Sequence, residues 1–327
     1  MTAHRPVAAP TPDDLEAAWR VVRAHLAPSP LDPGEGTPAE PALKLESLQP
    51  TGAFKIRGAL SALSRVPAGV RVVTASAGNH ALGIAHAGRI LGRPATVVVP
   101  ETASPAKVDR LRRLGVDLVV TGATYDEAER HAQELAEAGA HYLSAYNDPH
   151  VIAGQATIGR ELDAQLAGSR GPVTVVCPIG GGGLASGLGL WAAGRPDVRV
   201  VGVEAAASTA VSAAVAAGHQ VPVEVGPTIA DGLAGNIEPG SVTVDLIARH
   251  VHSLVTVEEH EIHAALAHLA TARGYVAEGA GAAAVAALLT GKVQGEGTHV
   301  AIVSGRNITP ETLAASLTRA PHPRRSD

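Results

Sequence analysis

Lys55 is the residue whose type and surroundings most favour covalent chemistry. It lies in the segment TGAFKIRGA, residues 51–59, where its neighbours include glycine, alanine and phenylalanine. Poor hydration disfavours the charged form of an amine, and an uncharged lysine can form a Schiff base with an aldehyde. A lone lysine is most often a solvated surface residue, so this interpretation depends on the segments that accompany it.

A second candidate segment is an anion site at residues 76–81, which read SAGNHA and join a predicted strand to a predicted helix. Exposed backbone N–H groups at such a junction suit a carboxylate. The Ser76 hydroxyl adds a donor, and the Asn79 amide can hydrogen-bond a phenolic oxygen. An ordinary turn with a capping Asn79 explains the same residues when they are taken alone.

Four consecutive glycines form the third candidate, in the segment IGGGGL at residues 179–184. Between a strand and a helix, such a run lets the backbone wrap a phosphate while the helix dipole favours negative charge. A flexible linker rarely separates a buried strand from an apolar helix. A dinucleotide-binding loop is the competing interpretation, but its glycines are spaced rather than contiguous, and no acidic residue closes the next strand before Glu204.

Ser304 is the fourth candidate, in the segment AIVSGRN at residues 301–307, after the last predicted strand. A hydroxyl at the carboxyl end of a strand can face a ring nitrogen. A plain turn accounts for the same residues, so this signal gains weight only beside the other three.

These candidates lie at the ends of short strands that alternate with Ala-rich amphipathic segments. Continuous apolar strands separated by helices are typical of mostly parallel sheets covered on both faces, so the predicted fold class is α/β. We expect a smaller domain at residues 66–146, a larger one from residues 1–65 plus 147–320, and flexible tails at residues 1–12 and 320–327. The predicted strands are residues 70–74, 95–99, 117–120, 173–177, 198–203, 254–257 and 299–303.

Helix starts are marked by capping residues. Ser104 followed by Pro105 is a typical N-cap and first-turn pair. Thr124 with Glu127, and Thr256 with Glu259, have the spacing of capping boxes. A helix over residues 80–91 is expected to end at Gly92.

Composition argues against several classes of function. Hydrophobic residues make up 46% of the chain, charged residues 17%, and the net charge of −5 suggests neither a nucleic-acid partner nor a membrane surface. Arg110, Arg112 and Arg113 stand at helical spacing and are interpreted as a solvated face. Cys177 is the single cysteine, which fits a small buried hydrophobe in a reducing cytoplasm. No signal peptide is predicted.

Taken in order, the four candidates resemble the fold-type II pyridoxal-phosphate enzymes, in the branch of threonine/serine dehydratases (ammonia-lyases) and serine racemases. The likeness runs from about residue 41 to residue 307 and includes the segments VIAGQ, TIADG and EGAGA at residues 151–155, 228–232 and 278–282. It implies a two-lobed, tryptophan synthase β-like fold in which each lobe is a mostly parallel twisted sheet flanked by helices. It also implies a cytoplasmic homodimer acting on an amino acid.

The resemblance also implies roles for individual residues. Lys55 would carry pyridoxal 5′-phosphate as a Schiff base and act as the catalytic base, Asn79 would hold the cofactor's 3′ oxygen, and Ser304 would face its ring nitrogen. The smaller domain would bind the substrate carboxylate through Ser76, Gly78, Asn79 and His80. The full predicted cofactor site is Phe54, Lys55, Asn79, Gly180, Gly181, Gly182, Gly183, Leu184, Gly232, Glu278 and Ser304.

The Gly-Asn-His triplet ending at His80 resembles the dehydratases, and Ala77 stands where racemases of this branch place a serine. Alanine cannot donate a proton from the second face of the cofactor, so elimination is favoured over racemisation. Some relatives bind a divalent cation at positions that correspond here to Glu204, Ser208 and Ala210. Because alanine supplies no carboxylate, no metal site is predicted, and Glu204 is the only plausible ligand of a degenerate one.

The sequence therefore predicts elimination of ammonia from L-threonine and/or L-serine, giving 2-oxobutanoate or pyruvate. Two alternatives keep the same fold: a dehydratase of another β-hydroxy amino acid, such as 3-hydroxyaspartate or phenylserine, and a serine racemase. A nicotinamide-dependent oxidoreductase that uses the glycine run is the alternative from another class.

Overall fold

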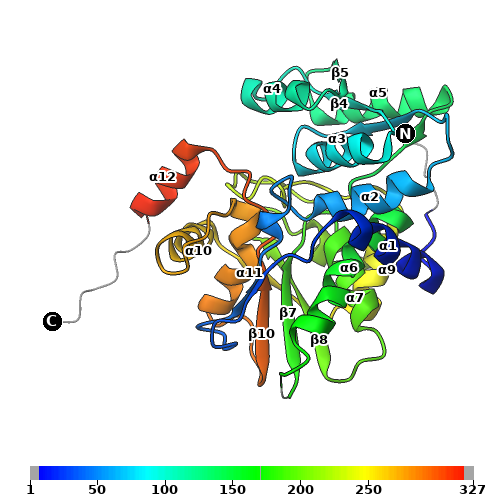
Figure 1. Cartoon of the computed structure of the whole chain (residues 1–327). Helices are drawn as coiled ribbons and strands as arrows, with labels where there is room; N and C mark the ends of the chain where they lie inside the picture. The colour runs from blue at the N-terminus through cyan, green and yellow to red at the C-terminus, as the bar shows by residue number, and fades with distance from the viewer. Residues whose placement is uncertain (1–6, 170, 320–327) are drawn as a thin grey trace.

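Two mainly parallel sheets organise the chain, and the computed structural model describes residues 7–169 and 171–319 of it. The expected tail at residues 320–327, and residues 1–6 of the other expected tail, lie outside the described residues. In Figure 1 the four-stranded sheet with its helices forms the upper part of the molecule, and the six-stranded sheet forms the lower part. This arrangement is the predicted α/β class.

The four-stranded sheet is wholly parallel and has the order β5-β4-β3-β6. Strand β3, the first of them in the sequence, starts two residues later than predicted, because the Val70 N–H donates to the Pro67 carbonyl oxygen in a turn. Its strands are β3 (Val72–Ala75), β4 (Ala95–Val99), β5 (Asp117–Val120) and β6 (His141–Tyr142), and its helices are α3 (Asn79–Leu91), α4 (Pro105–Arg113) and α5 (Tyr125–Glu137).

The six-stranded sheet has the order β1-β2-β10-β7-β8-β9, and only its β1–β2 pair is antiparallel. Its central strand β7 is buried along its whole length, as the continuous apolar run predicts. The strands are β1 (Leu31–Asp32), β2 (Ala42–Lys44), β7 (Val173–Pro178), β8 (Val198–Ala205), β9 (Ser253–Val257) and β10 (Thr298–Ile302).

Alternate residues of these strands face two separate hydrophobic clusters. Val175 and Cys177 pack with α6 (Pro149–Gln165), α7 (Gly183–Ala192), α8 (Ala210–Ala217) and α9 (Val242–His250). Val176 faces the other way, toward α10 (Glu259–Thr271) and α11 (Gly279–Leu289), and α12 (Pro310–Arg319) packs on α10. Both faces of the sheet are therefore covered by helices. No helix among the described residues is long and apolar enough to cross a membrane.

Helix α2 (Lys55–Arg65) lies between the two sheets and packs against α3 on one side and α6 on the other (Figure 1). Helix α1 (Pro12–His25) and α2 share a hydrophobic cluster, and a short 3₁₀ helix η1 (Glu46–Leu48) precedes α2. Pro12 thus opens a helix within the stretch that the sequence suggested as a tail. Because Lys55 is the first residue of α2, the packing of this helix sets the position of its amine.

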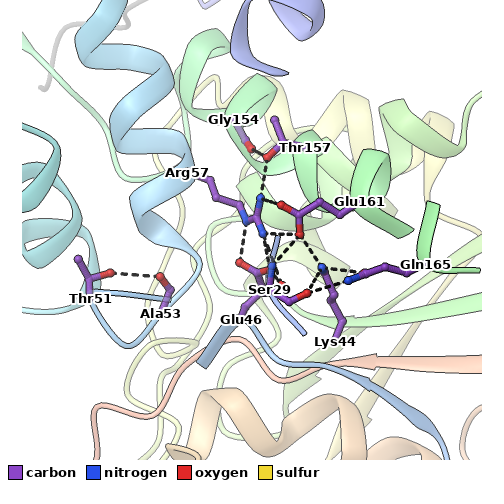
Figure 2. Close-up of polar contacts among 10 residues, drawn as sticks. All are labelled: Ser29, Lys44, Glu46, Thr51, Ala53, Arg57, Gly154, Thr157, Glu161 and Gln165. Carbon is purple, nitrogen blue, oxygen red and sulfur yellow. Dashed lines mark hydrogen bonds and ion pairs between the residues drawn. The ribbon is translucent and has the colours of Figure 1, made fainter. Parts of the chain in front are cut away.

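A buried ionic cluster anchors the first turn of α2 through Arg57 (Figure 2). Arg57, two residues after Lys55, donates to the Glu46 carboxylate at 2.7 and 2.8 Å and to the Glu161 carboxylate at 2.6 and 2.8 Å. Lys44 donates to Glu161 at 2.5 Å. The cluster joins α2 to α6, β2 and η1, and it comprises Ser29, Lys44, Glu46, Arg57, Thr157, Glu161 and Gln165.

The predicted helix caps are confirmed in part. Ser104 caps α4 by accepting the Lys107 N–H. Thr124 accepts the Glu127 N–H as expected, but the Glu127 carboxylate accepts from Ala123 N–H, so the reciprocal bond of the predicted box is displaced by one residue.

The second predicted box, Thr256 with Glu259, is wrong. Thr256 lies within β9, and α10 is capped by Glu258, which forms its own box with Glu261. The Glu259 carboxylate instead accepts from the backbone N–H of Ile229, in the loop before α9. A neighbouring acidic residue with the same spacing therefore took the capping position.

Candidate active site

One large cavity, of about 1050 Å³, opens where the carboxyl ends of strands from both sheets meet. Every residue predicted for the cofactor and substrate sites lines it, although the motifs are separated along the chain. They are Phe54, Lys55, Ser76, Gly78, Asn79, His80, Gly180, Gly181, Gly182, Gly183, Leu184, Gly232, Glu278 and Ser304. The structure thus brings the whole predicted set together.

Lys55 begins α2 with its amine facing this cavity. Its Nζ donates to the Ala145 carbonyl oxygen at 2.9 Å and lies 5.2 Å from the centre of the Phe54 ring. Burial lowers the pKa of Lys55 to about 8, and the Glu278 carboxylate only partly opposes that effect. The turn before it is tied to β10, because Phe54 N–H donates to the Ser304 carbonyl oxygen at 3.0 Å. An amine held this way can act as a nucleophile or base near neutral pH.

The junction between β3 and α3 supplies backbone donors. Helix α3 begins at Asn79 after Gly78, and the first N–H groups of a helix have no acceptor within the helix. Ser76 Oγ accepts the Gly78 N–H at 3.2 Å, which leaves its hydroxyl hydrogen available to donate. This geometry suits a carboxylate, the group predicted to bind here.

His80 is buried and uncharged. Burial and the neighbouring Lys55 charge lower its pKa to about 3, despite a contact of 3.3 Å between Nε2 and the Leu143 carbonyl oxygen. Because a carbonyl oxygen can only accept, Nε2 carries the proton and Nδ1 does not. Nδ1 has no partner among residues 7–169 and 171–319. The backbone N–H of His80, rather than its ring, is then the group that could donate to an anion.

The glycine run turns the chain from β7 into α7. Gly182 has a φ of 91°, the left-handed region that favours glycine. A side chain at Gly181 would collide with the ring of Tyr146. Thr243 Oγ1 donates to the Gly181 carbonyl oxygen at 2.8 Å and so fixes the loop. A bulky residue is excluded here, and the backbone stays exposed to the cavity at a helix N-terminus, where a phosphate is favoured.

Glu278 and Ser304 line another part of the cavity wall. Burial, helped by the Asp231 charge, raises the pKa of Glu278 to about 7, although donors from Asn79 and Asn307 oppose the rise. The Asn79 amide donates to Glu278 Oε1 at 2.6 Å. Ser304 Oγ makes only a long contact of 3.5 Å with the Ala280 carbonyl oxygen. Its hydroxyl can therefore take a better partner.

Two residues that sequence reasoning missed complete this wall. Asn307 donates to Asn79 Oδ1 at 2.6 Å, and Arg110 donates to Asn307 Oδ1 at 2.7 Å. The interpretation of Arg110 as part of a solvated face is wrong: it is half-buried and lines the cavity, whereas Arg112 and Arg113 are exposed. The available signal was the three-residue spacing of Lys107 and Arg110, which puts both on one face of α4.

Glu204 does not line the cavity. Its carboxylate accepts the backbone N–H groups of Val211 and Ser212 at 2.8 and 3.1 Å, in the first turn of α8. Among the described residues, no group of three or more His, Cys, Asp or Glu side chains could hold a metal ion. That the protein works without a metal stays a prediction.

Comparisons with known proteins find similar sequences and similar structures. A family model described as "Pyridoxal-phosphate dependent enzyme" matches residues 24–305. An L-threonine ammonia-lyase of Thermotoga maritima is 43% identical over 280 residues, covering 84% of this chain and 69% of that protein. The processed form of threonine deaminase isoform 2 from Solanum lycopersicum has a TM-score of 0.84 at 32% identity, covering 98% and 92%. Maize serine racemase also has a TM-score of 0.84, at 28% identity, covering 95% and 98%.

Proposed function

The chain belongs to the family of pyridoxal-phosphate-dependent enzymes, and on that premise we propose that it is an ammonia-lyase for L-threonine and L-serine. The reaction eliminates water from the β-hydroxy amino acid, and hydrolysis of the resulting enamine takes up one water and releases ammonia and a 2-oxo acid. The observation that carries the proposal is the half-buried Lys55 amine, with its lowered pKa, in the same cavity as the glycine run and the start of α3.

The residues of the cavity fit the cofactor. An aldehyde needs an amine that is partly uncharged near neutral pH, which burial provides at Lys55. A phosphate needs backbone donors without side chains, which Gly180–Gly183 offer at the start of α7. A cavity of about 1050 Å³ accommodates a cofactor together with an amino acid.

Pyridoxal 5′-phosphate, which Lys55 and the glycine run would hold, would supply an electron sink that makes the proton on the substrate's Cα acidic. The Lys55 amine, which faces the cavity, would take that proton from Cα. Its lowered pKa suits it to accept and release a proton near the working pH. Loss of the β-hydroxyl gives an enamine, which water hydrolyses to the 2-oxo acid and ammonia.

The substrate carboxylate is proposed to bind at the start of α3. Ser76 donates through its hydroxyl, and Asn79 and His80 donate through their backbone N–H groups. The neutral His80 ring adds no positive charge, so recognition depends on the helix dipole and on hydrogen bonds. This anchoring orients Cα toward Lys55.

Threonine is the first candidate substrate because relatives and structural neighbours are named for it. Racemisation is the second candidate, favoured by the similarity to maize serine racemase. Ala77 opposes it, because a racemase needs a second proton donor on the face of the cofactor away from Lys55. We also propose a cytoplasmic homodimer, on the resemblance to this branch of the family.

A substrate panel tests the proposal. Purified protein with pyridoxal 5′-phosphate is given L-threonine, L-serine, 3-hydroxyaspartate and phenylserine, and the 2-oxo acids and the chirality of unreacted substrate are measured. We expect 2-oxobutanoate or pyruvate without D-serine. Release from only the last two substrates, or accumulation of D-serine, would replace the proposal with one of its alternatives.

Lys55→Arg tests the catalytic amine. Arginine keeps the positive charge but cannot form the Schiff base, so both turnover and the visible absorbance of the lysine-bound cofactor should disappear. Survival of that absorbance would show that another group carries the cofactor.

A further inference from the structure

Four side chains that meet in the cavity wall form a directed chain of hydrogen bonds. Arg110 Nη1 donates to Asn307 Oδ1 at 2.7 Å, and Asn307 Nδ2 donates to Asn79 Oδ1 at 2.6 Å. Asn79 Nδ2 then donates to Glu278 Oε1 at 2.6 Å. Arg110 comes from α4 of the four-stranded sheet, whereas Asn307 follows β10 of the six-stranded sheet. The chain therefore crosses between the two sheets.

The direction of the chain is favoured from both ends, because the Arg110 guanidinium can only donate and the Glu278 carboxylate, when charged, can only accept. A guanidinium can only donate, so Asn307 must turn its oxygen toward Arg110. Both hydrogens of the Asn307 amide are then used, one on Asn79 Oδ1 and one on the Thr51 carbonyl oxygen at 3.0 Å. An amide by itself has no such preference, because its oxygen and nitrogen ends are nearly equal in size.

The orientation of Asn79 follows from that of Asn307. With its oxygen taken by Asn307, Asn79 presents its Nδ2 group to the cavity and to Glu278. In the opposite orientation it would present an oxygen there, and an oxygen cannot donate to a phenolic oxygen. Such half-buried hydrogen bonds are stronger than exposed ones, and neighbouring bonds polarise each other.

We propose that Arg110 is a positioning residue that acts through Asn307 to hold the Asn79 amide with its nitrogen toward the 3′ oxygen of the cofactor. The inference rests on the proposed function and on the role that the family resemblance implies for the Asn79 side chain, a hydrogen bond to that oxygen. Arg110 itself makes its hydrogen bonds to protein groups, Asn307 Oδ1 and the Thr51 carbonyl oxygen. Its effect on the cofactor should depend on its being a pure donor.

Two substitutions of Arg110 separate donor direction from size and polarity. Arg110→Lys keeps a side chain that can only donate, and should retain the wild-type visible spectrum and cofactor affinity within about twofold. Arg110→Gln can donate or accept, so it no longer dictates direction. We expect it to shift the visible absorbance of the holoenzyme and to weaken cofactor binding about fivefold, the loss of one hydrogen bond.

A double-mutant cycle tests whether the effect passes through Asn307. Arg110→Gln, Asn307→Ala and the double variant are compared by cofactor titration and visible spectrum. The double variant should be no worse than Asn307→Ala alone, since the intermediary is already absent. Arg112→Ala, in an exposed ion pair with Asp109 on the same helix, is the matched control and should change neither readout.

Additive effects in the cycle, or equal behaviour of the Lys and Gln variants, would overturn the inference. Thermal melting of the cofactor-free protein shows whether the Arg110→Gln variant folds. If it does not, the spectra and cofactor affinities of the Asn307→Ala and Arg110→Lys variants still test the inference. Failure of the proposed function is a separate outcome. Failure of ammonia release would appear in the substrate panel of the wild-type protein, and failure of the cofactor assignment as the absence of lysine-dependent absorbance in the wild-type protein.

Discussion

Two polar regions flank the first turn of α2, and they treat buried charge in opposite ways. Behind the helix, the buried ionic cluster matches Lys44 and Arg57 with Glu46 and Glu161 (Figure 2). In front of it, the cavity holds Lys55 with a carbonyl oxygen as its acceptor, at 2.9 Å. Arg57 is only two positions after Lys55 in the sequence, so the contrast comes from the partners that the fold supplies.

The pKa values of the carboxyl groups record this difference, whereas burial lowers the pKa of Lys44 in the cluster as it does that of Lys55. Burial raises the pKa of Glu46, but the charge and hydrogen bonds of Arg57 outweigh that effect, so the carboxylate stays charged. Burial lowers the pKa of Lys55 to about 8 and raises that of Glu278 to about 7, and the opposing contacts do not cancel it. Paired charges therefore serve structure, and incompletely paired ones stay ready to exchange protons.

Breaking the cluster should give the largest effect. Glu161→Gln removes one carboxylate and leaves Lys44 and Arg57 with one buried negative partner. We expect the free energy of unfolding to fall by about 3–5 kcal/mol, measured by urea denaturation. Arg160→Ala, at the preceding position of α6, breaks an exposed ion pair with Glu16 of α1 and should cost less than about 1 kcal/mol. Equal losses in the two variants would contradict the contrast.

The cluster could not be predicted from the sequence, whereas most of the cavity could. Lys44 and Glu161 are 117 residues apart, and each looks like an ordinary surface residue in its own segment. Nothing local indicates that a lysine and an arginine will share a buried carboxylate. Pairing of this kind is a property of the tertiary structure alone.

The cavity motifs, in contrast, are contiguous and lie at junctions between strands and helices. The backbone conformation of the glycine run and of residues 76–81 can be inferred from their own residues, so the sequence predicted that both segments would line one site. Arg110 and Asn307 were missed because their role comes from the hydrogen bond between them. That bond joins segments of two different sheets that are far apart in the sequence. The predicted helix caps were wrong where a neighbouring residue could take the same N-cap position, as Glu258 did in place of Thr256.

Glu278→Gln should give the next largest effect, seen in the pH dependence of stability. The pKa of Glu278 rises from 4.5 to about 7 on folding, so between these values the folded cofactor-free protein holds a proton that the unfolded chain has released. Stability should therefore fall as the pH rises through this window, by ~3 kcal/mol in total. Glutamine does not titrate and should flatten that part of the profile.

Urea denaturation from pH 4 to 8 measures this slope. Glu16→Gln, on the protein surface, is the control and should keep the wild-type profile. An unchanged slope in the Glu278→Gln variant would mean that Glu278 is charged throughout and belongs with the paired groups.

A smaller effect is expected on the pH at which the Lys55 amine becomes reactive. In cofactor-free protein, the rate of its modification by an amine reagent should rise with a midpoint near pH 8, against 10.5 for an unperturbed lysine. Glu278→Gln should move the midpoint below 8, because the negative charge that favours the ammonium is removed. Mass spectrometry of the modified peptide measures the rate, and a peptide of residues 51–59 is the reference. A midpoint near 10.5 would place Lys55 among solvated lysines.

The smallest effect is expected at the rim of the cavity, where Lys107 pairs with Asp231 at 2.9 Å. Both side chains are largely exposed, at 46% and 66%, so Lys107→Ala should change the free energy of unfolding by less than about 1 kcal/mol, and less still in high salt. Asp231 affects the site through its negative charge, which helps to raise the pKa of Glu278. Asp231→Asn should therefore move the pH-dependent fall in stability to lower pH while leaving its maximum almost unchanged. A loss in stability as large as that of Glu161→Gln would mean that the rim is structural, and the division between paired and reactive charges would then not follow burial.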